Sequence, residues 1–236
     1  MKPVCRVFVI SLFASMLAYP PALSAQWNKK PYTEWSEKEA TKVLNDSPWG
    51  QTQNLTDTLQ MTGQARVDSG QSRIADVFNV NIRIRFLSAK PVRQAISHLM
   101  EMKNRETISA QLAAKLKAFA AADFPDYIVI TVTSESDKAS ALLQQTQAAF
   151  YKLTTGELKN NTYILAGNQR IFIQEYQPPG KDGLGARYIF PRLVDGKPFI
   201  TPETGDVLFR SEPAGFTKLN MRYKVKDMMF DGKLEY

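Results

Sequence analysis

His98 is the only histidine of the chain and the first residue to consider for catalysis or metal binding. It lies in the stretch HLMEM, beside Leu99 and Met100, where the pattern predicts a helix. A metal site without a second histidine or a nearby cysteine would have to consist of carboxylates, and no carboxylate spacing in the chain indicates one. A lone histidine on an apolar helix is typical of a packing residue, so we expect neither a metal nor a cofactor.

Carboxylates are the remaining candidates for catalysis, because the chain lacks the G-x-S-x-G string of many serine hydrolases. Glu175, Asp182 and Glu203 fall in or next to predicted loops of the C-terminal half. Two carboxylates can hydrolyse a glycosidic bond, but they pair in space and have no sequence spacing of their own. The segment 180–185 (GKDGLG) lacks the spacing of a phosphate-binding loop and is better explained as a hairpin connection.

Cations alternate with apolar residues in two predicted strands, 80–86 and 218–226. If the two strands are neighbours, their polar sides merge into one basic face of a sheet that attracts an anionic partner. The alternative is a solvated outer face, on which cations serve solubility and protect a sheet edge. The residues of this candidate face are Arg83, Arg85, Arg222, Lys224 and Lys226.

All three tryptophans lie within or beside residues 26–50, an expected N-terminal helical segment. Trp35 and Trp49 flank its short predicted helix. They could form an aromatic platform for a sugar or a peptide, or they could dock the helix onto the main domain. We favour docking, because a helix this short is only marginally stable without tertiary contacts.

The elements that must position these residues can be predicted from local signals. Ser36 and Glu39 fit a capping box, which predicts a helix from Glu37 to about Asn45. Residues 51–76 are rich in polar residues and glycine, so we predict a polar loop or linker, with at most one edge strand, at residues 55–61. The pattern then predicts a strand, two helices, a strand and a helix, at 80–86, 90–100, 106–122, 127–133 and 136–153.

The last third of the chain carries three hairpin signals, at residues 167–168, 195–196 and 231–232. Helices gathered early and hairpins late predict an α+β fold. We expect a mostly antiparallel sheet with about three helices on one face, plus the short N-terminal helix docked by tryptophans. Residues 77–236 would form this single α+β domain.

Residues 1–25 have the three regions of a secretory signal peptide. Lys2 and Arg6 form a basic start, residues 7–19 an uncharged apolar stretch, and residues 20–25 (PPALSA) a cleavage site. The apolar stretch is too short to span a bilayer, for which about 20 residues are needed. We therefore expect an exported protein, periplasmic or secreted, without a transmembrane segment after removal of the signal peptide.

The composition of the remaining chain limits the classes of partner and of chemistry that we expect. Without the two cations of residues 1–25, the formal net charge falls from +7 to +5. Such a mild excess favours anionic surfaces but is not the dense charge of a nucleic-acid-binding protein. The single cysteine, Cys5, is removed as well, which excludes disulfides and thiol chemistry.

The two ends of the expected mature chain resemble a family of exported bacterial proteins of unknown function. Residues 31–49 contain the opening W-S-x-x-E followed by S-P-W, which is also seen ahead of some GWxTD-domain proteins. Residues 224–235 (KVKDMMFDGKLE) look like the C-terminal strand of the same group. No GWxTD string occurs here. The resemblance implies export and an envelope or secreted role, and it supplies no catalytic residues.

These observations favour a non-enzymatic binding or structural module of the cell envelope or the secretome. Its expected partner is an envelope protein or an anionic envelope surface, and we expect no nucleic acid. The alternative is a carboxylate-dependent hydrolase that acts on envelope polymers.

Overall fold

The computed structural model describes residues 30–57, 78–214 and 216–236. Helices and antiparallel strands are mixed in these ranges, which confirms the predicted α+β class. The predicted signal peptide lies outside the described residues. Within the described ranges, no helix is both long and apolar enough to cross a membrane.

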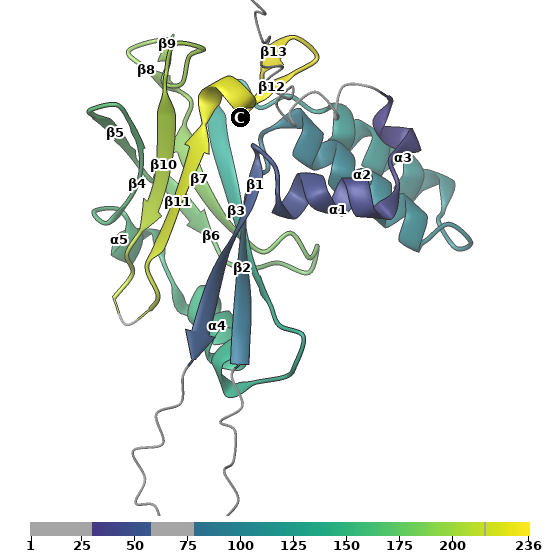
Figure 1. Ribbon diagram of the computed structural model, residues 1–236, viewed down its shortest axis with the longest axis horizontal. Coiled ribbons are helices and arrows are strands. Elements are labelled where there is room, and N and C mark those ends of the chain that lie inside the picture. The colour runs from purple at the N-terminus through teal and green to yellow at the C-terminus, as the bar shows by residue number, and fades with distance from the viewer. Residues whose placement is uncertain (1–29, 58–77, 215) are drawn as a thin grey trace, which may run out of the picture.

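Most strands form two antiparallel sheets, which pack face to face (Figure 1). The five-stranded sheet runs in the order β1 (Gly50–Asp57), β2 (Phe78–Phe86), β3 (Tyr127–Glu135), β7 (Ala186–Pro191) and β6 (Glu175–Gln177). The four-stranded sheet runs in the order β11 (Leu219–Lys224), β10 (Asp206–Ser211), β4 (Thr162–Ala166) and β5 (Gln169–Phe172). Two short hairpins pair β8 (Leu193–Val194) with β9 (Lys197–Pro198) and β12 (Met229–Phe230) with β13 (Lys233–Leu234).

The three predicted hairpin turns are all present, between β4 and β5, β8 and β9, and β12 and β13. In the second and third turns both central residues have positive φ: 50° at Asp195 and 75° at Gly196, and the same values at Asp231 and Gly232. Positive φ at both positions is the geometry of the type I′ turn, whose twist matches that of the flanking strands.

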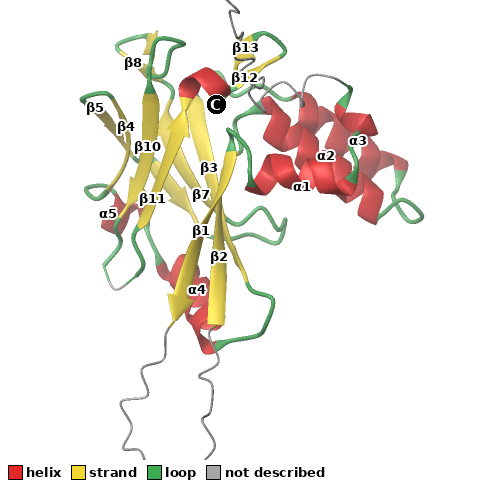
Figure 2. Ribbon diagram, viewed as in Figure 1, coloured by secondary structure: helices red, strands yellow, loops and turns green. Residues whose placement is uncertain are grey.

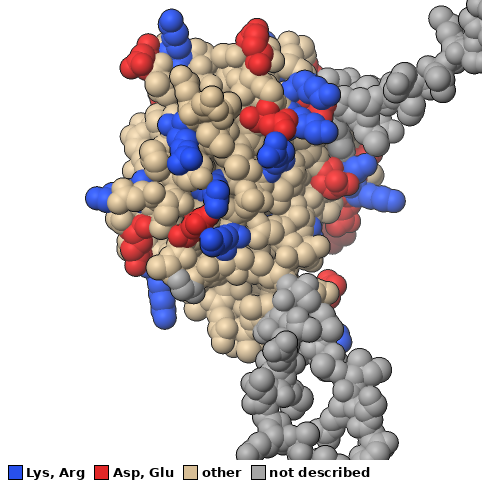
Figure 3. All heavy atoms as spheres, turned by 60° about the vertical axis from the view of Figure 1, so that its left-hand side comes forward, with Lys and Arg blue, Asp and Glu red and all other residues tan. Residues whose placement is uncertain are grey.

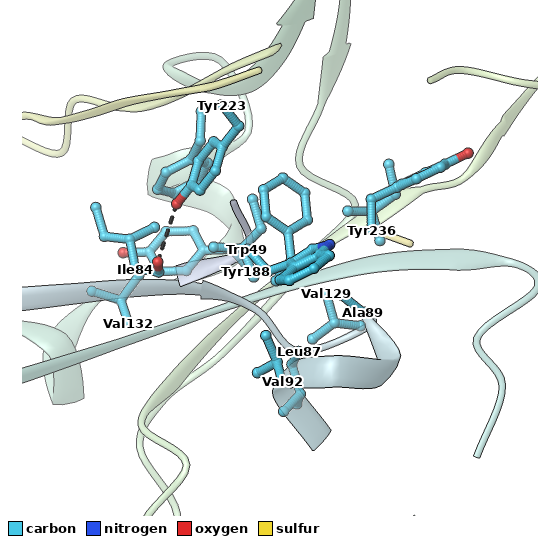
Figure 4. Close-up of a cluster of buried hydrophobic side chains, with 14 of the residues drawn as sticks. Trp49, Ile84, Leu87, Ala89, Val92, Val129, Val132, Tyr188, Tyr223 and Tyr236 are labelled. Atoms are coloured by element: carbon cyan, nitrogen blue, oxygen red, sulfur yellow. Dashed lines mark hydrogen bonds between the residues drawn. The ribbon is translucent and has the colours of Figure 1, made fainter. Parts of the chain in front are cut away.

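The main core lies between the two sheets (Figure 4). Tyr223 of β11 is fully buried, and its hydroxyl donates a 3.1 Å hydrogen bond to the carbonyl of Ile84 in β2. Its ring packs edge to face against Phe86, with the ring centroids 4.8 Å apart. Tyr188 of β7 packs in the same way against Phe209 of β10, with the ring centroids 5.4 Å apart. Aromatic pairs of this kind add stability beyond the area they bury, so they join the sheets directly.

The helices lie beside the five-stranded sheet and at one end of the sandwich (Figure 2). α2 packs between α1 and α3, and α1 also contacts β1 and β2. α4 packs against β2 and β3, and its Phe150 meets Phe216, which follows β10, at 5.0 Å. The helices are α1 (Glu37–Asn45), α2 (Lys90–Lys103), α3 (Ala110–Ala121), α4 (Ala141–Lys152) and α5 (Thr155–Leu158), with 3-10 turns η2 (Tyr32–Glu34) and η3 (Val225–Asp227).

Three predicted boundaries were wrong. The predicted polar loop 51–76 begins with strand β1, whose pairing with β2 uses backbone groups and therefore needs no apolar alternation. α3 begins after the cap residue Ser109, not at residue 106. α4 begins after the cap residue Ser140, not at residue 136, whose hydroxyl donates to the carbonyl of Asn79.

A seam of side-chain hydrogen bonds joins the edge strands of the two sheets. Gln53 of β1 accepts from the amide of Asn220 at 3.0 Å and donates to the carbonyl of Lys218 at 2.8 Å. Gln51 donates to the carbonyl of Arg222 at 2.9 Å. Side-chain amides of β1 therefore take the place of a neighbouring strand along the outer edge of β11.

The capping box of α1 is present and makes a pH-dependent contribution to stability. Hydrogen bonds from Lys30 and from the amide and hydroxyl of Ser36 lower the pKa of the Glu39 carboxyl from 4.5 to about 2. The ionised form is thus favoured in the folded state, so its stabilisation is complete above about pH 4.5 and is lost as the pH falls toward 2.

We therefore expect Glu39→Gln to flatten the fall of stability between about pH 4.5 and pH 2. Urea unfolding of both proteins across this range gives the two pH profiles. Profiles that run parallel throughout would contradict the assigned role of Glu39.

Candidate binding face

Trp35 is a packing residue in the contact between η2 and α2. Its side chain is 3% exposed. Its carbonyl accepts a 2.6 Å hydrogen bond from Nε2 of His98, which is itself buried. Tyr32 lies edge to face with both rings, at 6.4 Å from each. The only histidine is therefore occupied in holding the N-terminal segment against α2.

Trp49 joins the chain segments 31–49 and 224–235, which are far apart in the sequence. It is fully buried, and its indole N–H donates to the carbonyl of Glu235 at 2.9 Å. Its ring meets Phe230 edge to face at 5.9 Å. The Glu235 carboxylate also accepts from the amide of Lys90 at 2.9 Å, at the start of α2, where Ala89 provides no side-chain cap. Residues 31–49 and 224–235 thus pack together as one structural unit.

The S-P-W string ends α1 and turns the chain into β1. The Ser47 hydroxyl donates to the carbonyl of Val43 and accepts from the amides of Trp49 and Gly50, both at 3.1 Å. Any side chain at Gly50 would overlap the carbonyl of Leu44. Together with the capping box, these contacts explain the motif residues as determinants of the fold.

Arg85, predicted on the basic face, instead completes the C-terminal end of α1. Its guanidinium donates to the carbonyl of Leu44 at 3.0 Å, to the Asn45 side chain at 2.8 Å and to the Thr133 hydroxyl at 3.1 Å. A cation at this end of a helix satisfies free carbonyls and complements the helix dipole. Burial lowers the pKa of Arg85 to about 10, so it stays charged at neutral pH.

The predicted merging of strands 80–86 and 218–226 into one face was wrong. β2 and β11 belong to different sheets, and β1 lies beside β2 at the edge that faces β11. Arg83 forms an ion pair with Glu135 of β3 and also donates to Thr52. Strand order could not be inferred, because no local signal shows that β2 pairs with β1 and β3 while β11 pairs with β10 in another sheet.

Arg222 and Lys224 lie instead on the outer surface of the four-stranded sheet. We call this surface the open face, because no described helix packs over it (Figure 2). Lys226 lies just beyond it, exposed in η3. The register places Arg222, Leu208, Leu165 and Arg170 in one row across the strands, and Asn220, Arg210, Tyr163 and Phe172 in the next.

The open face carries more positive than negative charge. Its five cations are Arg170, Arg210, Lys218, Arg222 and Lys224. Asp206 pairs with Arg222 at 3.0 Å, and Glu212 pairs with Arg210 and Lys218. Five cations against two carboxylates leave a formal excess of three charges. Figure 3, which turns this side of the molecule forward, shows Lys and Arg side chains with carboxylates between them.

Sequence reasoning missed Arg170, Arg210 and the aromatic residues beside them. The signal was present in β5, whose sequence QRIF puts Arg170 and Phe172 on one side by the alternation of a strand. Tyr163 and Phe172 lie edge to face at 5.8 Å, and Phe172 is 45% exposed. Phe172 is thus an exposed aromatic residue that lies among the cations of this face.

Two of the three candidate carboxylates, Asp182 and Glu175, have side-chain partners within the fold. Asp182 pairs with Arg187 and accepts from the amide of Leu184, and Glu175 accepts from the Gln177 side chain. Glu203 lies in the turn before β10, which is a strand of the other sheet. The cavity between β3, α4 and the loop before β7 is lined by none of the three. Among the described residues, no cluster of three or more potential metal ligands occurs.

The fold and the site define an α+β protein whose two-sheet sandwich exposes a cationic sheet face. Comparison with protein-family models, with curated proteins and with solved structures finds no match.

Proposed function

We propose that this chain is an exported, non-enzymatic binding module whose open face engages an anionic partner of the cell envelope. The observation that carries the proposal is the excess of positive charge on a rigid sheet surface that no described element covers. Cations held on one rigid surface can contact one anionic partner together, whereas the diffuse net charge is screened within about 8 Å at physiological salt.

Export is the expectation from residues 1–25, and it would bring the open face into contact with envelope polymers and lipid headgroups. The engagement of Asp182 with Arg187, and of Glu175 with Gln177, favours binding over the alternative of carboxylate-dependent hydrolysis. The contacts of Trp35 and Trp49 within the fold favour docking over an aromatic platform.

Reversing two charges of the open face tests the proposal. We expect Arg222→Glu/Lys224→Glu to weaken binding to an anionic polymer or anionic vesicles at least about tenfold at low salt, because each cation near an acidic surface adds about 1 kcal/mol. Cosedimentation with phosphatidylglycerol vesicles and affinity electrophoresis in acidic polysaccharide measure the effect, each at low and high salt.

The matched control is Lys115→Glu/Lys117→Glu, which makes the same change in net charge at exposed positions of α3. The control should retain most of the binding. An equal loss in both variants would show that net charge, not the open face, governs binding. No binding of the wild type to any anionic probe would refute the proposed function itself.

A further inference from the structure

Arg170 differs from the arginines next to it on the open face. Arg210 and Arg222 are each paired with a carboxylate. The Arg170 side chain makes no hydrogen bond or ion pair with any described residue, and its guanidinium lies over the ring of Tyr163, 4.8 Å from the centroid. A guanidinium stacked on an aromatic ring is held in place while its N–H groups stay free to bind an oxyanion with two parallel hydrogen bonds.

Phe172 lies on the same side of β5 as Arg170, and both side chains contact the Tyr163 ring. It is two residues along the same strand and therefore on the same side, about 7 Å away at the backbone. Its ring is held edge to face by Tyr163, and 45% of the residue is exposed. An exposed ring fixed on a sheet is a flat apolar platform that costs little conformational entropy on binding. A sugar ring packed on Phe172 would bring a carboxylate on that ring within reach of Arg170.

The shape of the open face argues against a lipid surface as the partner. Leu165 and Leu208, in the middle of the face, are half-buried. Phe172 is the one large apolar side chain of the described open face that is more than a third exposed. Stable membrane attachment without a lipid anchor requires a larger apolar surface buried among the headgroups.

We propose that Arg170 and Phe172 form the main contact point for an acidic polysaccharide, with a sugar carboxylate on the Arg170 guanidinium and the sugar ring on Phe172. Arg222 and Lys224 then attract further carboxylates of the same polymer. This inference rests on the proposed function and names the class of its partner.

Binding to polygalacturonate, its methyl ester, polyphosphate and phosphatidylglycerol vesicles tests the inference by titration calorimetry and cosedimentation. We expect the wild type to bind polygalacturonate and to lose this binding when the carboxylates are esterified. Arg170→Ala should weaken binding about tenfold or more, through the lost charge-assisted hydrogen bonds. Arg170→Lys keeps the charge but loses the planar fork, so it should weaken binding about threefold or more. Phe172→Ala should weaken binding to a similar degree.

Arg105→Ala is the matched control, since it removes one exposed arginine from the chain after α2. It should change affinity less than about twofold, because exposed single charges contribute little. Melting temperatures of all variants would show that each remains folded.

The possible results separate the inference from the proposed function. Equal losses for Arg170→Ala and Arg105→Ala, or full binding by Phe172→Ala, would overturn the Arg170–Phe172 contact. Binding to vesicles or polyphosphate without binding to polygalacturonate would overturn the polysaccharide and leave an anionic partner. Binding to none of the four probes would overturn both proposals.

Discussion

Trp49→Ala is expected to lower the free energy of unfolding by about 3–5 kcal/mol, the usual cost of truncating a buried tryptophan. Trp49 is fully buried, contacts Phe230 and donates to the carbonyl of Glu235. Its loss would leave a cavity where the start of β1 meets the C-terminal residues. Because Glu235 also caps α2 through the amide of Lys90, we expect the damage to extend to the helical part of the molecule.

Two further variants separate the causes of this effect. Trp49→Phe keeps an aromatic ring and removes the N–H donor, so we expect a cost of about 1–3 kcal/mol from the unpaired carbonyl and the lost volume. Tyr151→Ala, at a position that is 61% exposed, should change stability by no more than about 0.5 kcal/mol. Urea denaturation measures all three values. A cost below about 1 kcal/mol for Trp49→Ala would show that residues 31–49 are not an integral part of the fold.

Gly185→Ala is expected to destabilise the protein by about 3 kcal/mol, through two independent effects. Gly185 has a φ of 84°, a conformation that costs an L-residue roughly 1–2 kcal/mol. In addition, a Cβ atom at this position would overlap the carbonyl oxygen of Val132 in β3, and relieving such an overlap typically costs about 1–3 kcal/mol. The loop before β7 would have to move away from the five-stranded sheet.

Gly183→Ala is the matched control in the same loop. Gly183 also has positive φ, at 72°, but a Cβ atom there would meet nothing within 4 Å. We expect this variant to cost only about 1 kcal/mol, the conformational part of the effect. Thermal and urea unfolding give the loss in unfolding free energy for each variant. The difference between the two losses is the contribution of the close packing at Gly185. Equal costs would show that the contact with β3 is unimportant.

Features that depend on neighbouring residues could be predicted from the sequence. The capping box of Ser36 and Glu39 correctly gave the start of α1, and paired turn residues such as Asp231 and Gly232 gave the hairpins. In each case the atoms that form the structure are within a few residues of each other. The same is true of the alternation that predicted β2 and of the nearly continuous apolar run that predicted β3.

Features that depend on distant partners were missed or misassigned. β1 has a polar sequence because Gln51 and Gln53 bond to β11, about 170 residues further on, and not to solvent. Arg85 has the alternation of a solvent-facing cation, yet it caps a helix that begins 48 residues earlier in the chain, at Glu37. The open face combines β5 with β10 and β11, and no local signal indicates that these strands share a sheet.

The seam between β1 and β11 has a consequence for how the protein behaves at high concentration. An uncovered edge strand is a template on which a second chain can add a strand, and this is a common route to aggregation. Here Gln53 already occupies the amide of Asn220 and the carbonyl of Lys218, and Gln51 occupies the carbonyl of Arg222. An incoming strand would first have to displace these side-chain amides. The glutamines therefore hinder the addition of a strand at the edge of β11, while the adjacent open face remains accessible.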